Sequence, residues 1–257
     1  MARLSGRVAT VTGAGRGMGE AIALAFAREG AAVVAADLDL PGAERVAGVI
    51  RQAGGRARAL RVDVGEEADA EALARAAVEG FGGLDIHVNN AGIGLLRPFM
   101  ETSRADMERV MRVNLVGAML CAQAALRVML PRGYGRIVNI ASLSGQRGGL
   151  GRTAYGASKA ALELMTRVMS VELAASGITV NAIAPGAIAT GMAAHMHDAA
   201  TRDAYHRLIP QRRYGTAEEV AGAAVFLASD EAAHVCGHTL NVDGGFLSAG
   251  LMVDPAA

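Results

Sequence analysis

The sequence is poor in several kinds of residue, and each shortage excludes a class of protein. Its 257 residues include only two cysteines, Cys121 and Cys236, which lie far apart and outside any CxxC spacing. A disulfide framework and a cysteine-rich zinc site therefore have no support. Proline is scarce, with 6 residues, whereas 52% of the chain is hydrophobic, a composition that excludes intrinsic disorder.

Neither the charge nor the apolar segments point to a nucleic acid or a membrane. The 25 Lys+Arg residues balance the 25 Asp+Glu residues without any block of like charge, so we expect no nucleic-acid partner. Apolar runs such as Val220 to Ala228 reach about half of the roughly 18 residues that span a bilayer. The first residues show no apolar segment followed by a small-residue cleavage site. We therefore expect a soluble, cytoplasmic protein without a membrane partner.

Lysine is nearly absent, and its position is informative. Lys159 is the single lysine among the 25 basic residues, and it follows Tyr155 by four positions. A lysine ammonium is a compact donor with an adaptable pKa, whereas arginine keeps its proton. This pair is therefore a candidate for chemistry that arginine cannot perform, with Tyr155 as a proton donor.

Short apolar runs alternate with amphipathic patterns along the chain, without a repeat or a linker. This alternation predicts a single α/β domain over 1–257, a Rossmann-type, doubly wound, seven-stranded parallel sheet with helices on both faces. The expected strands are 7–12, 32–37, 56–62, 84–88, 136–141, 178–184 and 238–242. The expected helices are 17–29, 41–53, 66–80, 104–130, 153–176 and 216–229. The segment 187–213 interrupts the alternation and is the expected substrate lid.

A glycine-rich turn joins the first expected strand to the first expected helix. The sequence TGAGRGMG at 12–19 fits the spacing G-x-x-x-G-x-G, and glycines at such a turn let the backbone approach a pyrophosphate. An ordinary tight turn is the alternative, and the absence of a following Gly-Lys-Ser/Thr argues against nucleotide hydrolysis. The expected cofactor contacts here are Gly13, Arg16, Gly17, Met18 and Gly19.

Asp37 ends the second expected strand, 24 residues after Gly13. A carboxylate at this place can bind both ribose hydroxyls of the adenosine and repel a 2′-phosphate, which favours NAD over NADP. Two observations leave alternatives open, because Asp37 can also cap a helix and Arg16 can attract a phosphate. Two further turns at strand ends are candidate cofactor contacts, at Asp63 and Val64 and at Asn90, Ala91 and Gly92.

Ser142, Tyr155 and Lys159 form a pattern that suits proton transfer. Residues four apart share one face of a helix, so Tyr155 and Lys159 can address the same small volume. Hydride transfer from a carbinol leaves an oxygen that must lose a proton, and a positive charge near a phenol brings its pKa toward neutrality. Ser142, just after the fifth expected strand, can hydrogen-bond the substrate oxygen.

Together with the glycine turn and the NNAG sequence at 89–92, this pattern resembles that of a classical short-chain dehydrogenase/reductase over essentially the whole chain. The resemblance implies that Tyr155 is the general acid/base and that Lys159 lowers its pKa and binds the nicotinamide ribose. Asn114 matches the fourth catalytic member, which helps to hold a proton-relay water. The nicotinamide carboxamide would contact a loop that contains Pro185, Gly186, Ile188 and Thr190.

The resemblance fixes the reaction type better than the substrate. We expect an NAD(H)-dependent oxidoreductase that interconverts a secondary alcohol, such as a small polyol, sugar or hydroxy compound, with its ketone. The alternatives are an NADPH-dependent 3-oxoacyl-[acyl-carrier-protein] reductase, motivated by Arg16, Arg127 and Arg167, and a non-catalytic dinucleotide-binding redox sensor. No metal site is expected from the scattered histidines, including His195 and His197.

Two further expectations concern surfaces. The long apolar helices at 104–130 and 153–176 exceed what one sheet face needs, and the family commonly pairs such helices, so we expect a homotetramer. The substrate pocket is expected to involve the lid together with Leu95, Leu96, Gln146, Arg147 and Arg152.

Overall fold

The computed structural model describes residues 2–191, 197–250 and 252, and its centre is one parallel sheet. The strand order is β3-β2-β1-β4-β5-β6-β7, and every neighbouring pair runs parallel, which confirms the expected doubly wound fold. The strands are β1 Val8–Thr12, β2 Ala32–Asp37, β3 Ala57–Arg61, β4 Ile86–Asn89, β5 Gly135–Ile140, β6 Ile178–Pro185 and β7 Thr239–Val242.

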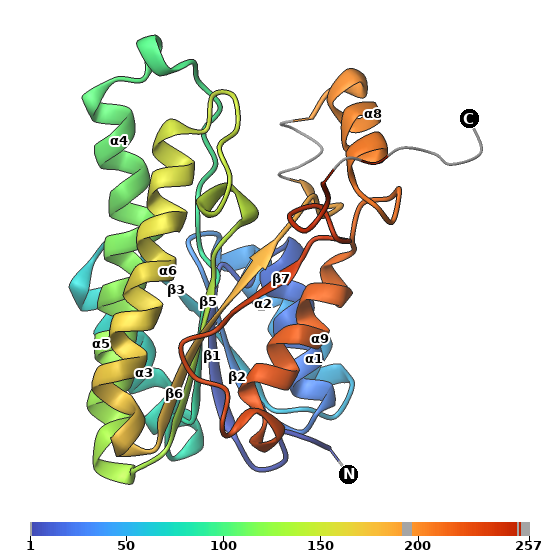
Figure 1. Cartoon of the computed structure of the whole chain (residues 1–257). Helices are drawn as coiled ribbons and strands as arrows, with labels where there is room; N and C mark the ends of the chain where they lie inside the picture. Colours follow the sequence, from blue (N-terminus) through green and yellow to red (C-terminus); the bar gives the residue numbers. More distant parts are fainter. Residues whose placement is uncertain (1, 192–196, 251, 253–257) are drawn as a thin grey trace.

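Helices cover both faces of this sheet (Figure 1). One layer contains α3, α5 and α6, with α4 above them, and the other contains α1, α2 and α9. The helices are α1 Gly17–Arg28, α2 Leu40–Gln52, α3 Glu67–Phe81, α4 Arg104–Met111, α5 Gly117–Met129, α6 Thr153–Leu173, α8 Ala199–Leu208 and α9 Ala217–Ala228. Because helices lie on both sides, the central strands are apolar throughout and fully buried.

The helix expected over 104–130 is correct in place and differs in detail. A π-helical segment, Arg112–Val116, separates α4 from α5 and contains Asn114. Such wide turns occur mostly at functional sites, and this one turns a buried polar side chain toward α6. The helix α8 lies inside the expected lid and is the one described helix that the apolar pattern did not predict.

One helical stretch is long and apolar enough to cross a membrane by length and composition alone. It spans Arg104–Arg132; its most apolar 18-residue window has a mean hydropathy of 1.6, and 44% of that window is buried inside the fold. The stretch packs against α3, α6 and the sheet, as a core helix of a globular domain would. Its composition therefore has an explanation within the domain, and the test gives only weak support for a membrane span.

A chain of buried polar side chains crosses the sheet from β1 to α6. His87 lies between Thr10 Oγ1, at 2.8 Å from Nδ1, and Asn89 Oδ1, at 2.9 Å from Nε2. Asn89 Nδ2 donates to Asn139 Oδ1, and Asn139 Nδ2 donates to Thr166 Oγ1 on α6. Since Asn89 Oδ1 can only accept, Nε2 carries a proton, and the lowered pKa of the buried ring keeps His87 neutral at pH 7. Burial lowers the pKa of His87 from 6.5 to about 4.

The neutral His87 should make the protein lose stability in mild acid. The unfolded chain takes up a proton as the pH falls below 6.5, whereas the folded protein resists protonation down to about 4. The free energy of unfolding should therefore fall by about 3 kcal/mol between pH 7 and about pH 4 because of this group. Chemical denaturation at several pH values should show this decline in the wild type. It should be smaller in His87→Gln and unchanged in the exposed control His234→Gln; equal declines in all three proteins would contradict the prediction.

Candidate active site

The candidate active site lies where strands β1, β4, β5 and β6 end. Parallel strands place their carboxyl ends at one edge of the sheet, so the loops that follow them meet there. A solvent-open pocket of about 650 Å³ occupies this edge and extends beneath α8. The polar side chains that line it carry hydroxyl or nitrogen groups and belong to Ser142, Ser144, Arg152, Tyr155, Thr190, His197 and Tyr205.

The glycine turn after β1 is packed too closely for side chains. A Cβ at Gly13 would lie 2.8 Å from Asn90 Nδ2, and a Cβ at Gly19 would overlap the carbonyl oxygen of Gly13. Gly13 and Gly17 also adopt positive φ, at 64° and 61°. The turn therefore presents bare backbone at the start of α1, which is the arrangement that accepts a pyrophosphate. Met18 lines the pocket, whereas Arg16 is exposed at the start of α1.

Asp37 lies at the end of β2, directly beside this turn. Its Oδ2 accepts a hydrogen bond from Gly15 N at 2.8 Å, and its Oδ1 accepts one from Asp39 N at 3.0 Å. Each carboxylate oxygen has a second lone pair, so the group can still receive hydroxyl donors. Arg45, the neighbouring cation, is held by Glu20 at 2.7 Å and by the Gly15 carbonyl oxygen. Among the described residues, Asp37 therefore has no cation paired with its carboxylate.

Asn90 and Thr12 hold the turns after β1 and β4 together. Asn90 Nδ2 donates to the carbonyl oxygens of Thr12 and Gly13, at 2.9 and 3.0 Å. Thr12 Oγ1 in turn accepts from the backbone N–H groups of Asn90 and Ala91. Both amide hydrogens of Asn90 are therefore engaged within the protein, and its side chain shapes the cofactor turn from behind.

Gly92 is the point where the NNAG turn meets two of the candidate catalytic side chains. A Cβ there would lie 3.2 Å from Asn114 Oδ1 and 3.6 Å from Lys159 Nζ. Asn114, fully buried in the π-helical segment, accepts from Ile93 N at 2.8 Å and donates to the Ile93 carbonyl oxygen and to Ser158 Oγ. Asn114 therefore links the turn after β4 to α6, one residue from Lys159.

Asp63 and Val64 end up at the expected edge but are already engaged. Asp63 accepts from Gly65 N at 2.9 Å and pairs with Arg112 at 3.2 Å. Burial would raise the pKa of Asp63, but these two donors lower it below its usual value. Val64 is buried and packs beside Gly117 on α5. Their contact with an adenine ring stays a prediction.

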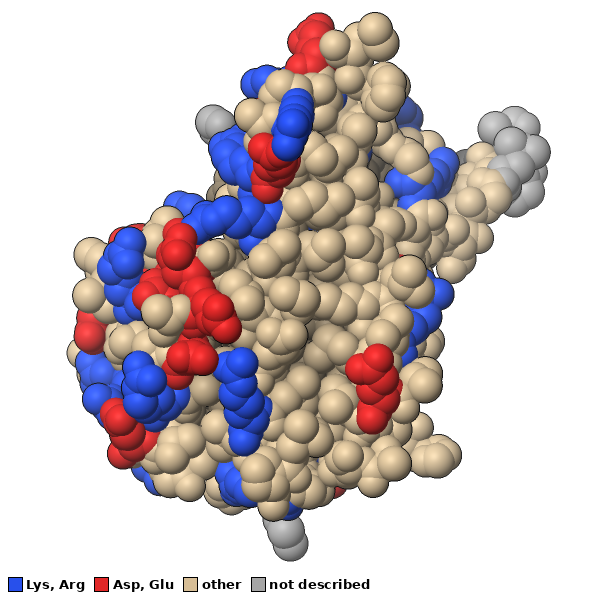
Figure 2. All heavy atoms as spheres, turned by 90° about the vertical axis from the view of Figure 1, so that its left-hand side faces the viewer, with Lys and Arg blue, Asp and Glu red and all other residues tan. Residues whose placement is uncertain are grey.

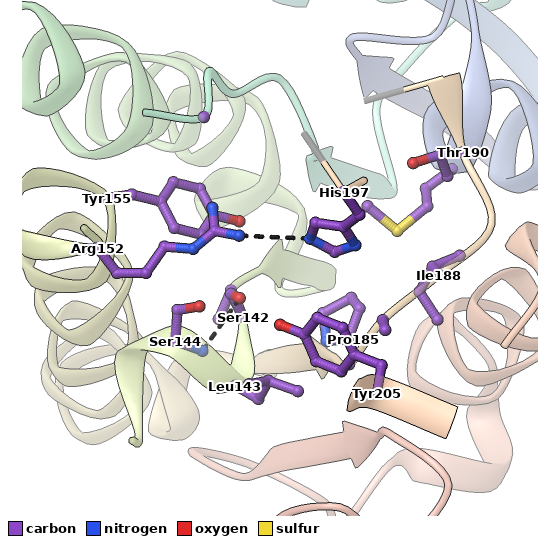
Figure 3. Close-up of a pocket in the computed structure, with 15 residues that line it drawn as sticks. Ser142, Leu143, Ser144, Arg152, Tyr155, Pro185, Ile188, Thr190, His197 and Tyr205 are labelled. Atoms are coloured by element: carbon purple, nitrogen blue, oxygen red, sulfur yellow. Dashed lines mark hydrogen bonds between the residues drawn. The ribbon is translucent and has the colours of Figure 1, made fainter. Parts of the chain in front are cut away.

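Ser142 and Tyr155 both line the pocket (Figure 3), and Lys159 follows Tyr155 on α6. Ser142 follows β5, its hydroxyl accepts from Ser144 N at 3.1 Å, and it lines the same pocket as Tyr155. Lys159 is buried one helical turn below Tyr155, with Nζ 5.9 Å from the centre of the tyrosine ring. The ammonium donates to the Ile140 carbonyl oxygen at 2.7 Å, at the end of β5.

The protonation of this group follows from its burial. Burial raises the pKa of Tyr155, and the hydrogen bond with Ser142 and the positive charge of Arg152 oppose the rise. Burial also lowers the pKa of Lys159 from 10.5 to about 8. The lowering of the Tyr155 pKa by Lys159, which the family resemblance implies, stays a prediction.

The loop after β6 closes the pocket on the other side. Pro185 ends the strand, and Gly186 allows close contact with Asp243, where a Cβ would come within 2.8 Å. Ile188 pairs with Gly215 in a parallel bridge, and the Thr190 side chain lies beside Gly17. All four expected residues, Pro185, Gly186, Ile188 and Thr190, line the pocket.

The substrate side of the pocket was less predictable. Of the residues expected to shape it, Arg152 lines the pocket, whereas Leu96 is 55% exposed and Arg147 stacks on Phe246 outside it. Tyr205 on α8 and the half-buried His197 complete the wall. Their position in an irregular segment gave no periodic signal. The part of the lid at 192–196, with His195, lies outside the described residues.

Metal ligands do not gather here. The described residues contain no group of three or more His, Cys, Asp or Glu side chains placed to hold a metal ion.

Closing the glycine turn with a single methyl group should prevent dinucleotide binding. In Gly19→Ala the new Cβ would collide with the Gly13 carbonyl oxygen, so the turn must open. We expect the dissociation constant for NADH, measured by fluorescence titration, to rise at least tenfold. This corresponds to a loss of binding free energy on the order of 1.4 kcal/mol or more. Gly48→Ala is the matched control, because no atom lies within 4 Å of its Cβ and its helix should gain stability. Equal affinity of the two variants would contradict the assignment.

Comparison with known proteins agrees with this geometry. The sequence family described as "Enoyl-(Acyl carrier protein) reductase" matches residues 13–247. D-threitol dehydrogenase of Mycolicibacterium smegmatis is 40% identical over 244 residues, 95% of this chain and 94% of that protein. The 3-oxoacyl-[acyl-carrier-protein] reductase of a Synechocystis species is 39% identical, over 96% of this chain and 99% of its own length.

A solved structure extends the agreement to the fold. The structure of 7α-hydroxysteroid dehydrogenase, in complex with NADH and 7-oxo glycochenodeoxycholic acid, superposes with a TM-score of 0.92 at 38% identity, covering 95% of each chain. Sequence, fold and the arrangement of Ser142, Tyr155 and Lys159 thus agree over almost the full length. The chain belongs to the short-chain dehydrogenase/reductase family of oxidoreductases.

Proposed function

We propose that the protein interconverts a small secondary alcohol and its ketone with NAD(H), using Tyr155 as the general acid/base. The observation that carries this proposal is the convergence of Tyr155, Ser142 and Lys159 beside a glycine turn too tight for side chains. The cradle fits a dinucleotide, since it offers bare backbone at a helix N-terminus next to a carboxylate. When bound, the nicotinamide supplies or accepts the hydride.

The side chains supply the remaining steps. Ser142 holds the substrate oxygen beside the Tyr155 hydroxyl, and Tyr155 gives a proton to this oxygen in reduction or takes it in oxidation. Lys159 provides a positive charge beneath the phenol and, with a pKa lowered by burial to about 8, can exchange a proton near neutral pH. Asn114 holds Ile93 and Ser158 in place around Lys159, which suits a path for that proton.

The preference for NAD(H) rests on the charge around Asp37. Its carboxylate can accept two ribose hydroxyls, and a 2′-phosphate at the same place would meet a negative charge. Arg45 is neutralised by Glu20, which leaves Arg16 as the cation that could favour NADP(H). The relative crystallised with NADH is compatible with this choice.

The decisive experiment is a turnover assay by nicotinamide absorbance with NAD(H) and NADP(H) in parallel. The substrates are polyols, sugars, small ketones and 3-oxoacyl thioesters. We expect activity with NAD(H) on the small substrates, and a loss of about a hundredfold or more in Tyr155→Phe, which removes the proton donor but keeps the ring. NADH affinity should be unchanged in this variant. Full turnover by Tyr155→Phe would refute the proposed role.

A 3-oxoacyl-[acyl-carrier-protein] reductase is the second candidate, because relatives with that name are among the similar proteins. Such an enzyme needs free cations for an acidic carrier protein, yet Arg127 pairs with Glu71 at 3.0 Å. The spacing of four between Tyr155 and Lys159 suits a carbonyl reductase better than an enoyl reductase. Activity confined to NADPH and acyl thioesters in the same assay would favour this candidate.

We propose further that the chain forms a homotetramer through α5 and α6. The face that these helices present is largely free of charged side chains (Figure 2). It exposes apolar side chains on both helices, including Met119 on α5 and Leu164, Val168 and Val171 on α6. Val171 is 83% exposed, which is costly for an isolated domain and typical of an interface.

The cytoplasmic location expected from the sequence also stays a prediction.

The assembly can be tested by light scattering. The wild type should have the mass of four chains, and Val171→Glu should dissociate it, because the carboxylate would lose its hydration in the apolar contact. Val49→Glu on α2, whose valine is also exposed, is the matched control and should stay tetrameric. A stable monomer in the wild type would end the proposal.

A further inference from the structure

Arg152 places a cation in the wall of the candidate active-site pocket. It is the residue before α6, three positions before Tyr155, and its guanidinium lies 5.7 Å from the centre of the Tyr155 ring. Other arginines of the described chain, such as Arg45, Arg97 and Arg213, hold carboxylates at 2.6–2.8 Å. Among the described residues, no Asp or Glu forms an ion pair with Arg152.

Among the described residues, the side chain of Arg152 makes one hydrogen bond, which is long and involves a neutral group. Its guanidinium NH2 group lies 3.5 Å from His197 Nε2, across the pocket mouth (Figure 3). The other ring nitrogen of His197 faces the Tyr214 hydroxyl at 3.0 Å. Burial and the charges of Arg152 and Arg202 lower the pKa of His197, so the imidazole is neutral at pH 7. The guanidinium therefore keeps most of its donors, and all of its charge, for a ligand.

Several hydroxyl groups line the same pocket as this guanidinium. The hydroxyl groups of Ser142, Ser144, Tyr155 and Tyr205 turn toward the same space (Figure 3). Arg147 adds a second positive charge near the pocket, where it stacks on Phe246 at 5.0 Å without an ion pair among the described residues. A planar fork of N–H donors next to hydroxyl donors matches a carboxylate, which accepts two parallel hydrogen bonds.

We propose that Arg152 binds a carboxylate of the substrate, so that the protein acts on a short hydroxy acid and the corresponding oxo acid. This inference rests on the proposed function, because the carbinol must sit at Tyr155 and Ser142. The guanidinium lies against the Tyr155 ring, so only a few carbon atoms separate the carboxylate from the reacting carbon. The ion pair fixes the orientation of the substrate and thus the face of the carbinol that reacts.

The lid takes part through His197 and Tyr205. His197 stacks on Tyr205 of α8, with ring centres 5.0 Å apart, and its carbonyl oxygen accepts from Arg202. A carboxylate that takes the place of His197 Nε2 on Arg152 would leave this stack intact and meet the Tyr205 hydroxyl. Acid substrates should thus bind more tightly than neutral compounds of the same shape.

The test measures binding as well as turnover. Short oxo acids, with two to five carbons between the acid and the ketone ends, are titrated into the protein with its reduced dinucleotide, and quenching of the nicotinamide fluorescence is followed. Each acid is compared with its primary amide, which has the same shape without the charge. We expect at least about a tenfold preference for one acid over its amide in the wild type.

Three variants assign this preference to Arg152. Arg152→Gln should abolish it, Arg152→Lys should retain part of it because the charge remains without the fork, and Arg207→Gln should leave it unchanged. Arg207 is exposed on α8 and outside the pocket lining, so it controls for a general loss of charge. NADH affinity serves as the check that Arg152→Gln is folded.

The outcomes separate this inference from the proposed function. Tyr155-dependent turnover of neutral ketones, with equal affinities for acids and amides, would overturn the carboxylate site and leave the proposed function intact. An acid preference that survives in Arg152→Gln would also overturn it. Arg152-dependent binding of acids without turnover of any compound would support the carboxylate site and overturn the proposed reaction.

Discussion

The active site depends on one close approach, the contact between the turns that follow β1 and β4. Asn90 donates both amide hydrogens to the carbonyl oxygens of Thr12 and Gly13, and the Thr12 hydroxyl accepts from two N–H groups of the opposite turn. These hydrogen bonds satisfy backbone groups that would otherwise be buried without partners at the sheet edge. They also bring the turns so close that Gly13 and Gly19 have no room for a side chain. The bare backbone that can bind a pyrophosphate therefore results from the hydrogen bonds between the turns after β1 and β4.

The same hydrogen-bonded turns also position α6, the helix that carries Tyr155 and Lys159. From the turn after β4, Ile93 is bound on both backbone groups by Asn114, and Asn114 reaches Ser158, whose hydroxyl donates to the Tyr155 carbonyl oxygen. A second connection runs through the sheet, from Asn89 to Asn139 and on to Thr166 of α6. Buried polar networks of this kind are costly unless every member is satisfied, and when satisfied they favour a single arrangement. α6 is thus held at two heights by polar contacts, which fixes Tyr155 and Lys159 against the end of β5 more tightly than apolar packing alone would.

The sequence predicts those parts of this arrangement that follow from periodicity and local geometry. All seven strands were expected in the right places, and the central ones give the clearest signal because strands covered on both faces are apolar throughout. The glycine turn, Asp37 and the Ser142, Tyr155 and Lys159 set follow from their spacing and the family resemblance. The sequence predicts Asn114 on a regular helix, whereas the structure places it in a π-helical turn. The contacts of Asn114 with Ile93 and Ser158 join residues far apart in the sequence, so they leave no local pattern from which this turn could be predicted. For the same reason the sequence did not predict α8, nor the position of Tyr205 in the pocket wall. Arg152 was recognised as a pocket residue, but the lack of a carboxylate beside it depends on three-dimensional neighbours, which one sequence does not reveal.

Burial brings the acidities of the two central groups of the site closer together. It raises the pKa of the Tyr155 phenol and lowers that of the Lys159 ammonium to about 8, because each neutral form is favoured away from water. At neutral pH the phenol is therefore protonated and ready to donate, while the lysine is close to the point at which it can release a proton. The phenolate formed by donation needs compensation, which comes from the Ser142 hydroxyl and from the charge of Arg152 across the tyrosine ring. A carboxylate on Arg152 would cancel part of that charge and make the phenolate less stable. The same contact that orients an acid substrate would therefore strengthen Tyr155 as a base, which favours removal of the carbinol proton over its return.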